Sequence, residues 1–371
     1  MKKTVIGAAL LALSFGFVFT GCNKKGQTPA AGSGNAAKAS GFELALTTDS
    51  GTINDKSFNQ GAWEGLVAYA NENSKTVKYY QPAEISDEAY AQSIDLAVKG
   101  GAKVIVCPGY NFETSIWDAQ TKYPDVCFIL LDGTPHNEDG SDTTIGPKTV
   151  AVLYSEQQAG FLAGYAAVKE GYKKLGFMGG VAVPAVIRYG YGFVQGAEYA
   201  AEKLGVTGLE CKYTYVGNFS ATPENMAKAA SWYNDGTEVI FACGGAVGNS
   251  VMKAAETAGN GKAVIGVDVD QSSESVTVIT SAMKNLGQSV KNLVAAYYSG
   301  SFPGGKVLTL GADNDGVELP FDSSKFTKFT RAEYDELFKA LASNSIAIKD
   351  NTAAAEADGL GTKIVKVEVI K

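Results

Sequence analysis

Two short motifs recur at one spacing along the chain, and this repeat constrains the fold more than any other feature of the sequence. The pattern FxQGA begins at Phe58 and again at Phe193, and the pattern GxxVIxxxG begins at Gly101 and again at Gly236. The separation is 135 residues in both cases. Two matches in the same order at one separation predict two lobes that are built alike, although the patterning that α/β domains share could also produce them.

Short apolar runs alternate with amphipathic stretches along most of the chain. Residues 126–131 and 263–267 are typical of buried parallel strands, and residues 89–99 have the pattern of an intervening helix. The roughly 330 residues that follow the N-terminal region are too many for one ordinary core and enough for two domains. We therefore expect two α/β lobes, with a ligand cleft beyond the C-terminal ends of their parallel strands.

The N-terminal region is typical of an exported protein. Two lysines precede an apolar run, residues 5–19, that is too short to span a bilayer. Gly-Cys follows and resembles a bacterial lipobox, so we expect cleavage of residues 1–21 and a lipid on Cys22. Residues 22–40 have few large apolar side chains and should form a flexible tether. An ordinary cleavage site with a chance cysteine is the alternative.

Charge and rare side chains exclude several classes of function. The net charge is −7 and no basic stripe is present, so we expect no binding to nucleic acid. The single histidine, His136, excludes a multi-histidine zinc site, and we expect no metal or other cofactor. The cysteines beyond Cys22 show no C-x-x-C spacing and indicate buried thiols, with a disulfide left open: Cys107, Cys127, Cys211 and Cys243.

The first turn after an apolar strand combines polar side chains with an aromatic ring. Residues 42–48 form the apolar run, and Ser57, Phe58 and Asn59 follow at the start of a helix. Helix capping could explain the polar residues, and core packing could explain the ring. Because the turn lies at the C-terminal end of a strand, we expect all three residues to face the cleft.

Positions further along the chain supply more candidate binding residues. Asp132 and Asp268 end corresponding strands of the two halves, where a carboxylate can accept hydrogen bonds from a ligand or cap a helix. Phe219 should reach the cleft from the second lobe, and Tyr189 is the other candidate ring. Gly245 lies in a turn that is neither a P-loop nor GxGxxG, and its backbone could approach a ligand.

Ordered segments of the chain resemble the basic membrane protein (BMP) family of substrate-binding lipoproteins of ABC importers. The similarity runs from Phe42 to Pro320 and is carried by TTDSGTINDKSFNQGAWEGL, ILLD, EQQAGFLAGYAA, GGVAVPAVIRYGYGFVQG, YVGNF, FACGGAVGNSVM, IGVDVDQ and VITSAMKNLG. It implies a type I periplasmic-binding-protein fold, in which two three-layer αβα lobes are joined by a hinge and close on a ligand. We expect lobe one in residues 41–153 and 283–320, lobe two in 154–282, and the C-terminal segment 321–371 on lobe one or the hinge.

The resemblance also implies roles for individual residues, because the best-understood family members bind purine nucleosides. Phe58 would stack on one face of the base and Phe219 on the other. Asp132 would bind the base, and Asp268 would bind the ribose hydroxyls beside Lys284. A solvated surface position is the alternative for the lysine.

Several functions remain open at this point. A nucleoside-binding lipoprotein would be a monomer that is lipid-anchored at the extracytoplasmic side of the cell membrane and serves an ABC permease. A receptor for a sugar or sugar-like signal, or a surface antigen or adhesin, could keep the same fold. We expect no enzyme: Asp268 and Asp270 resemble the metal-binding aspartates of nucleoside hydrolases only superficially, since a calcium shell of several carboxylates is missing. Asp270 should lie in a loop.

Overall fold

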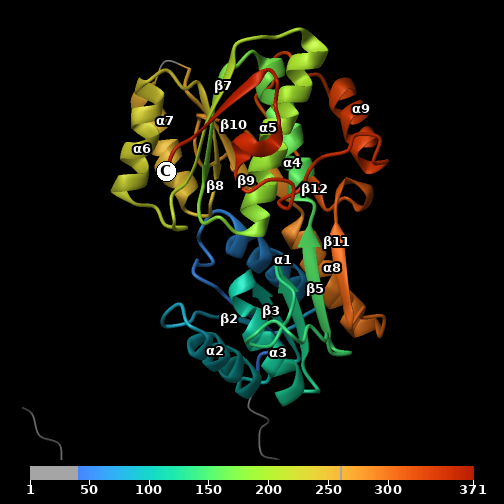
Figure 1. The fold of residues 1–371 in the computed structure, drawn as a ribbon. Coiled ribbons are helices and arrows are strands. Elements are labelled where there is room, and N and C mark those ends of the chain that lie inside the picture. The colour runs from blue at the N-terminus through green and yellow to red at the C-terminus, as the bar shows by residue number, and fades with distance from the viewer. Residues whose placement is uncertain (1–40, 260) are drawn as a thin grey trace, which may run out of the picture. The chain divides into compact units, whose positions relative to one another are not determined.

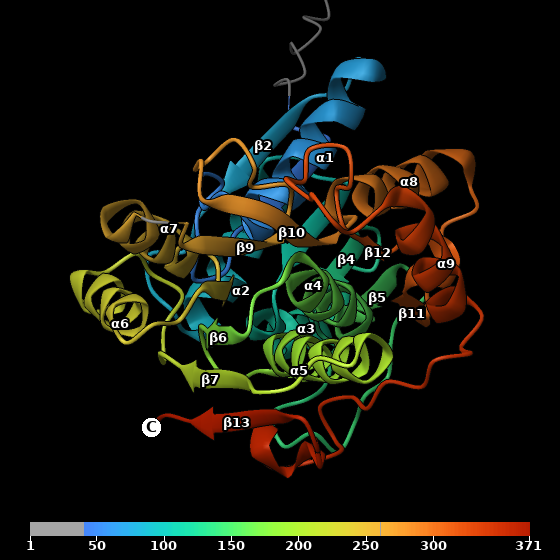
Figure 2. The same ribbon diagram turned by 90° about the horizontal axis from the view of Figure 1, so that it is seen from above.

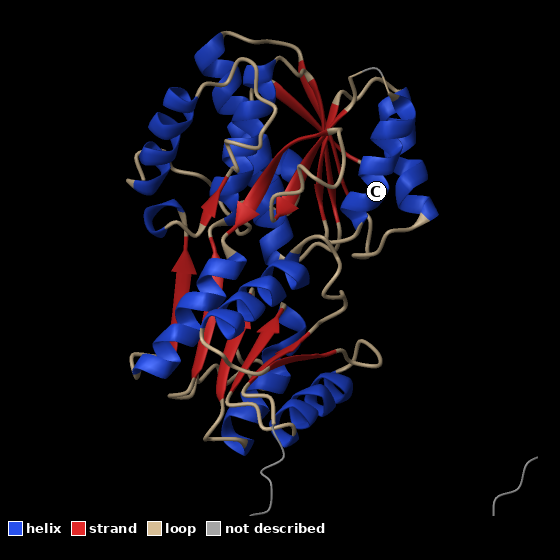
Figure 3. Cartoon of the chain, turned by 180° about the vertical axis from the view of Figure 1, so that it is seen from behind, coloured by secondary structure: helices blue, strands red, loops and turns tan. Residues whose placement is uncertain are grey.

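The computed structural model describes residues 41–259 and 261–371, and two β-sheets with helices on both faces form its framework (Figures 1 and 3). Both sheets belong to a single unit of the chain. The predicted signal peptide (1–21), tether (22–40) and lipidated Cys22 lie outside the described residues. No helix in the described part of the chain has both the length and the apolar character needed to cross a membrane.

The sheet of lobe one has six parallel strands in the order β11-β5-β4-β3-β1-β2. Its elements are β1 (Leu44–Thr47), β2 (Val77–Tyr80), β3 (Val104–Pro108), β4 (Cys127–Leu131), β5 (Thr149–Tyr154), β11 (Lys306–Leu310), α1 (Phe58–Glu72), α2 (Asp87–Lys99), η1 (Tyr110–Phe112), α3 (Glu113–Lys122) and α8 (Leu286–Ser299). Alternate strand residues face opposite ways, so Leu44 and Leu46 pack under α1 and α8 while Ala45 packs under α2 and α3. Burial on both faces explains the continuous apolar runs of these strands.

The sheet of lobe two has seven strands in the order β12-β10-β9-β8-β6-β7-β13, of which only β12 is antiparallel. Its elements are β6 (Lys174–Gly179), β7 (Leu209–Tyr215), β8 (Val239–Cys243), β9 (Ala263–Asp268), β10 (Val278–Lys284), β12 (Val317–Glu318), β13 (Val365–Val369), α4 (Glu156–Glu170), α5 (Pro184–Leu204), α6 (Pro223–Asn234) and α7 (Val247–Ala258). Helices α4 and α5 cover one face, and α6 and α7 cover the other.

The two lobes repeat one another, as the sequence motifs predict. The strand order β5-β4-β3-β1-β2 of lobe one corresponds to β10-β9-β8-β6-β7 of lobe two. Gly101 and Gly236 begin the repeated motif and have almost the same backbone angle, with φ of 97° and 99°. Asp132 and Asp268 end the corresponding strands and share the left-handed conformation, with φ of 60° and 67°. The predicted pair of similar α/β lobes is confirmed.

The glycine of the other motif is tightly packed in both lobes. A Cβ atom at Gly196 on α5 would collide with the backbone carbonyl of Phe161 on α4. A Cβ atom at Gly61 on α1 would collide with the side chain of Val269, and Leu286 at the start of α8 lies close beside it. Glycine at Gly196 therefore lets α5 pack closely against α4, and glycine at Gly61 leaves room for a side chain of lobe two.

The chain passes between the sheets at three crossovers. They lie between Tyr154 and Glu156, between Lys284 and Leu286, and between Leu310 and Val317. The last crossover precedes the predicted boundary at residue 320, because β12 already pairs with β10 in lobe two.

The C-terminal segment, predicted to pack on lobe one or the hinge, lies beside the third crossover at Ala312–Asn314 and otherwise packs on lobe two. Helix α9 (Arg331–Ala342) lies against α4, where Lys169 contacts Glu333 at 2.6 Å, and β13 then pairs with β7 as the outer strand of lobe two (Figure 2). The short helices η2 (Ala312–Asn314) and η3 (Ala357–Leu360) complete this part of the chain. Pairing with β13 satisfies backbone groups of β7 that an edge strand would leave open.

Candidate ligand-binding site

A cavity of about 290 Å³ lies at the C-terminal ends of strands from both sheets. This volume is close to the lower end of the range for small-molecule sites, about 300–1,000 Å³. Of the nine binding residues predicted from the sequence, eight line it: Phe58, Asn59, Asp132, Tyr189, Phe219, Gly245, Asp268 and Lys284. The ninth, Ser57, is fully buried behind this lining.

Asp55, and not Ser57, caps the first helix of lobe one. The Asp55 carboxylate accepts hydrogen bonds from the backbone N–H groups of Ser57, Asn59 and Gln60 at 2.9–3.1 Å. The Ser57 side chain makes no capping bond, although Ser57 occupies the N-cap position. Its hydroxyl instead donates to Asp268 Oδ2 at 2.5 Å and so connects the two lobes.

Asn59 holds a further carboxylate at the cavity wall. Its side-chain amide donates to Asp49 Oδ1 and to Asp55 Oδ2, both at 2.9 Å. Burial raises the pKa of Asp49 to about 6, against the lowering effect of the Gly51 N–H and Asn59. Asp49 lines the cavity and was not among the predicted residues, although its place directly after a buried strand was a usable signal.

Aromatic rings reach the cavity from both lobes. Phe58 at the start of α1 and Phe219 after β7 are partly buried and line it from opposite lobes. Tyr189 on α5 also lines it, but its ring packs edge-on against Phe241 and its hydroxyl lies 3.5 Å from Asp268 Oδ1. Gly245, with φ of 55°, lies beside Phe219. Phe58 and Phe219 therefore line the cavity from opposite lobes, whereas the Tyr189 ring is fixed against Phe241.

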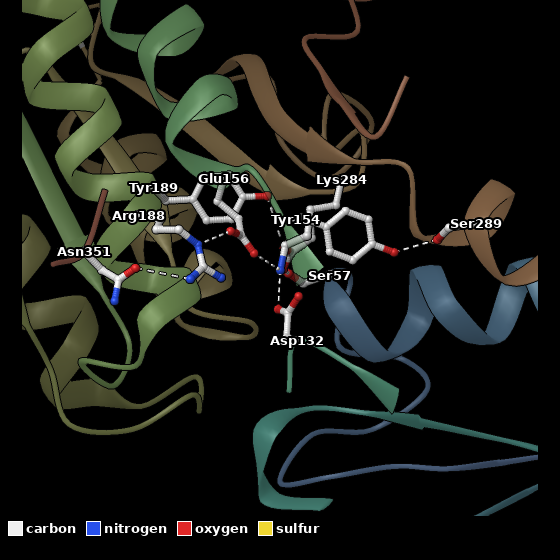
Figure 4. Close-up of polar contacts among 10 residues, drawn as sticks. Ser57, Asp132, Tyr154, Glu156, Arg188, Tyr189, Lys284, Ser289 and Asn351 are labelled. Carbon is white, nitrogen blue, oxygen red and sulfur yellow. Dashed lines mark hydrogen bonds and ion pairs between the residues drawn. The ribbon is translucent and has the colours of Figure 1, made fainter. Parts of the chain in front are cut away.

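Lys284 is at the centre of a buried group of charges (Figure 4). Its side chain is 2% exposed, which excludes the surface alternative. The ammonium contacts Asp132 directly, Glu156 Oε1 at 3.3 Å and Asp268 Oδ1 at 3.7 Å, and it lies 4.6 Å from the Phe58 ring centre. Burial lowers the pKa of Lys284, but the three carboxylates outweigh this effect and hold the pKa above its usual value.

Asp132 carries the polar atom that most directly indicates a ligand. Burial raises the pKa of Asp132 to about 7; Lys284 lowers this pKa, and Glu156 raises it further. Asp132 Oδ1 is buried and has no hydrogen-bond partner among the described residues. Since buried polar atoms are rarely left unpaired, this oxygen is suited to accept a hydrogen bond from a bound molecule.

Glu156 and Arg188 complete the group of charges and were missed from the sequence. Glu156, the first residue of α4, is fully buried, and its Oε2 accepts a hydrogen bond from Arg188 Nε at 2.5 Å. Arg188 Nη1 donates in turn to Asn351 Oδ1 at 3.3 Å (Figure 4). The only local indication of a site residue here was the acidic side chain of Glu156, close after the apolar run of β5.

The four cysteines in the described part of the chain are buried free thiols, so no disulfide forms among them, and one of them, Cys243, lines the cavity. His136 pairs with Glu113 at 3.3 Å outside the cavity lining. Asp270 lies in a loop, as predicted, and accepts a hydrogen bond from Ser323. No group of three potential metal ligands occurs in residues 41–259 and 261–371.

Two similar α/β lobes, three crossovers and a polar and aromatic cavity between them define a ligand-binding protein of the type I periplasmic fold. A solute-binding protein of an ABC transporter system from Aeropyrum pernix K1 shares this fold, with a TM-score of 0.66 and 21% identity. The similarity covers 82% of this chain and 87% of that one.

Residues 42–352 match the family model Bmp, which is described as ABC transporter substrate-binding protein PnrA-like, and the chain belongs to this family. It is 29% identical to the ABC transporter nucleoside-binding protein BmpA of Lactococcus lactis, over 87% of this chain and 93% of that protein. It is 27% identical to a CD4+ T-cell-stimulating antigen of Listeria innocua, over 94% of this chain and 99% of that protein.

Family membership settles the general function. The protein is an extracytoplasmic substrate-binding protein of an ABC transporter, and its partners are a ligand and a membrane permease. It is not an enzyme.

Proposed function

We propose that the protein captures purine nucleosides between its two lobes and delivers them to its permease. One observation carries the proposal: Phe58 and Phe219 line the cavity from opposite lobes, next to the charges around Lys284. Aromatic rings stack on any nucleobase, with about 1–3 kcal/mol per base. Sugar receptors also stack aromatic rings on their ligands, but a nucleobase offers a π-face to each of two such rings. The name of the Lactococcus lactis relative, a nucleoside-binding protein, agrees with this choice.

The polar groups of the cavity suit the two parts of a nucleoside. Asp268 and Lys284 together offer acceptors and donors for vicinal ribose hydroxyls. Asp132 Oδ1, which lacks a partner among the described residues, accepts from an N–H group of the base, and Asp49 supplies a second carboxylate on the lobe-one wall. The ligand therefore satisfies a buried oxygen that the protein leaves open.

The proposal includes the way in which the protein is held at its membrane. We propose that it acts as a monomer, anchored by a lipid on Cys22 through the tether of residues 22–40. Such an anchor would keep the substrate-binding protein close to its permease and raise the effective concentration of the two partners.

Small molecules retained by the purified protein test the proposal. The protein is denatured and the released compounds are identified by mass spectrometry, with a Phe58→Ala, Phe219→Ala double variant prepared in parallel. We expect a purine nucleoside from the wild-type protein and much less from the double variant. A free sugar from both proteins would favour the sugar-receptor alternative and contradict the proposal.

A further inference from the structure

Glu156 contacts Lys284 from outside the cavity lining. It is fully buried, yet neither Glu156 nor Arg188 is among the residues that line the cavity. Its Oε2 accepts a hydrogen bond from Arg188 Nε, while Oε1 forms an ion pair with Lys284 Nζ at 3.3 Å and accepts no hydrogen bond from the described residues. Glu156 therefore connects Lys284, which lines the cavity, to Arg188, which lies outside the cavity lining.

The contact also joins two of the three crossovers. Glu156 is the first residue of α4, directly after the chain leaves lobe one, and Lys284 is the last residue of β10, directly before the chain returns to it. An ion pair at this position ties the crossover segments together at the edge of the cavity. Any change in its geometry moves the ammonium relative to Asp132 and Asp268.

The balance of charge shows why Lys284 needs a partner outside the cavity. Two cations, Lys284 and Arg188, lie among three carboxylates, Asp132, Glu156 and Asp268, and Lys284, Glu156 and Asp268 are buried. Without Glu156, only the two carboxylates that line the cavity would hold the ammonium. A buried charge needs ionic and hydrogen-bonded partners to offset the hydration that it loses.

Arg188 extends this connection to the C-terminal segment. Its Nη1 donates to Asn351, and the neighbouring Lys349 is fixed by two hydrogen bonds to Gln195 on α5, at 2.8 and 2.9 Å. The segment from Asn351 onward therefore contacts the ligand site through Arg188 and Glu156.

We propose that Glu156 is a positioning residue for Lys284, and that Arg188 and Asn351 hold Glu156 in place. The proposal deepens the proposed function and rests on it only for the choice of ligand in the binding test. Glu156 touches no ligand itself. It sets where the lysine ammonium lies between Asp132 and Asp268 when the lobes close.

The first test measures binding of adenosine, guanosine and inosine by calorimetry. Glu156→Gln keeps the shape of the side chain and removes its charge, and we expect affinity to fall about tenfold or more for each nucleoside that the wild-type protein binds. Glu198→Gln is the matched control, because Glu198 accepts from the backbone N–H groups of residues 363–365 and makes no contact with Arg188. It should bind as the wild type does. Equal affinity of Glu156→Gln and the wild type would overturn the proposal.

A milder substitution, Asn351→Ala, tests the proposal if the Glu156→Gln variant does not fold. Asn351→Ala removes a half-buried partner of Arg188 and should weaken nucleoside binding two- to threefold, whereas Glu198→Gln should not. Unchanged binding by Asn351→Ala would overturn the part of the proposal that concerns the C-terminal segment.

A second test needs no ligand, so that it stays informative if no nucleoside binds and the proposed function fails. Several titratable or charged groups surround Lys284 and Glu156. They are Asp132 after β4, Tyr154 on β5, Arg188 and Tyr189 on α5, Cys243 on β8, Asp268 on β9 and, beside Arg188, Asp350 in the C-terminal segment. Of these, Asp132 has its pKa raised in part by Glu156. Glu156→Gln should therefore lower the pKa of Asp132 and make ionisation of Asp132 less costly to the fold.

Melting temperatures measured between about pH 5 and pH 8 report this change. The melting temperature of Glu156→Gln, relative to the wild type, should rise with pH. The same comparison is then made in an Asp132→Asn background, where residue 132 no longer titrates. The difference in melting temperature between the Asp132→Asn, Glu156→Gln double variant and Asp132→Asn alone should not change with pH. The same rise in both backgrounds would show that Glu156 acts independently of the Lys284 site and would overturn the proposal.

Discussion

The Ser57 hydroxyl donates a hydrogen bond of 2.5 Å to Asp268 Oδ2, and this bond joins the first turn of lobe one to a strand end of lobe two. The two residues are 211 positions apart in the sequence, and both are buried. Because Asp268 also faces Lys284 and the cavity, the bond connects contact between the lobes directly with the ligand site.

Ser57→Ala should weaken nucleoside binding and lower the melting temperature. A hydrogen bond to a charged group contributes about 1.5–3 kcal/mol, and the variant leaves one oxygen of a buried carboxylate without its donor. Differential scanning calorimetry and ligand titration measure both effects. Ser323→Ala is the control, since Ser323 donates to Asp270 on the surface and should have little effect on binding. Identical behaviour of the two variants would contradict the importance of the Ser57–Asp268 bond.

Asp268→Ala should cost far more binding than Asp270→Ala. Asp268 is buried at the cavity, and its loss leaves the ribose hydroxyls without an acceptor, a cost of about 1–3 kcal/mol or more. Asp270 lies two residues further on, outside the lining, and serves as the matched control. Titration calorimetry distinguishes them, and equal losses would refute the role of the strand-end carboxylate.

Phe58→Ala and Phe219→Ala should each weaken nucleoside binding by about 1–3 kcal/mol, and their effects should not add. The two rings come from different lobes, so loss of either ring reduces what closure gains from the other. Tyr189→Phe keeps the ring that packs on Phe241 and should bind with smaller loss. Normal binding by both alanine variants would rule out stacking between these rings.

Nucleoside binding should strengthen as the pH rises from about 5 to about 8, because hydrogen bonds from the ligand favour ionised carboxylates. Burial raises the pKa of Asp49 to about 6 and that of Asp132 to about 7, and both exceed the ordinary value of 3.8. A raised pKa means that the folded protein holds the proton of Asp49 or Asp132 more tightly than the unfolded chain does. The stability that these two protonated carboxyl groups contribute is therefore fully present below about pH 4 and is lost as the pH rises through their raised pKa values.

Calorimetry in buffers of different ionisation enthalpy measures the protons that binding releases. We expect release at about pH 6, and less release from Asp132→Asn than from the wild type. Asp139→Asn is a suitable control, because this carboxylate is exposed and its pKa is lowered by bonds to Ser141. Proton uptake on binding would contradict the assignment of donors to the ligand.

The strand-end residues could be found from the sequence because their position follows from local patterns. A buried apolar run marks a strand, its last residues lie at the carboxyl edge of a parallel sheet, and the repeat then relates Asp132 to Asp268. Phe58 and Phe219 were found in the same way, as residues that follow such runs.

Local sequence patterns do not indicate which distant segments of the chain contact one another. Nothing near Glu156 indicates that the start of α4 meets the end of β10, because the meeting depends on how the crossovers pack. The alternating valines of β13 do predict a strand, but not that it pairs with β7 in lobe two. The place of Asp49 after a strand is visible in the sequence, but its hydrogen bond from Asn59 at the cavity wall is not.

Calorimetric titration of the wild-type protein with a nucleoside, with its free base and with ribose tests the central claim most directly. In the proposed complex the base would contact Phe58 and Phe219 and the ribose would contact Asp268 and Lys284, so each part alone would make only some of the contacts that close the lobes. We expect adenosine, guanosine or inosine to bind far more tightly than adenine, guanine, hypoxanthine or ribose. Tight binding of ribose or glucose, with no heat from any nucleoside, would contradict the claim that the cavity captures purine nucleosides.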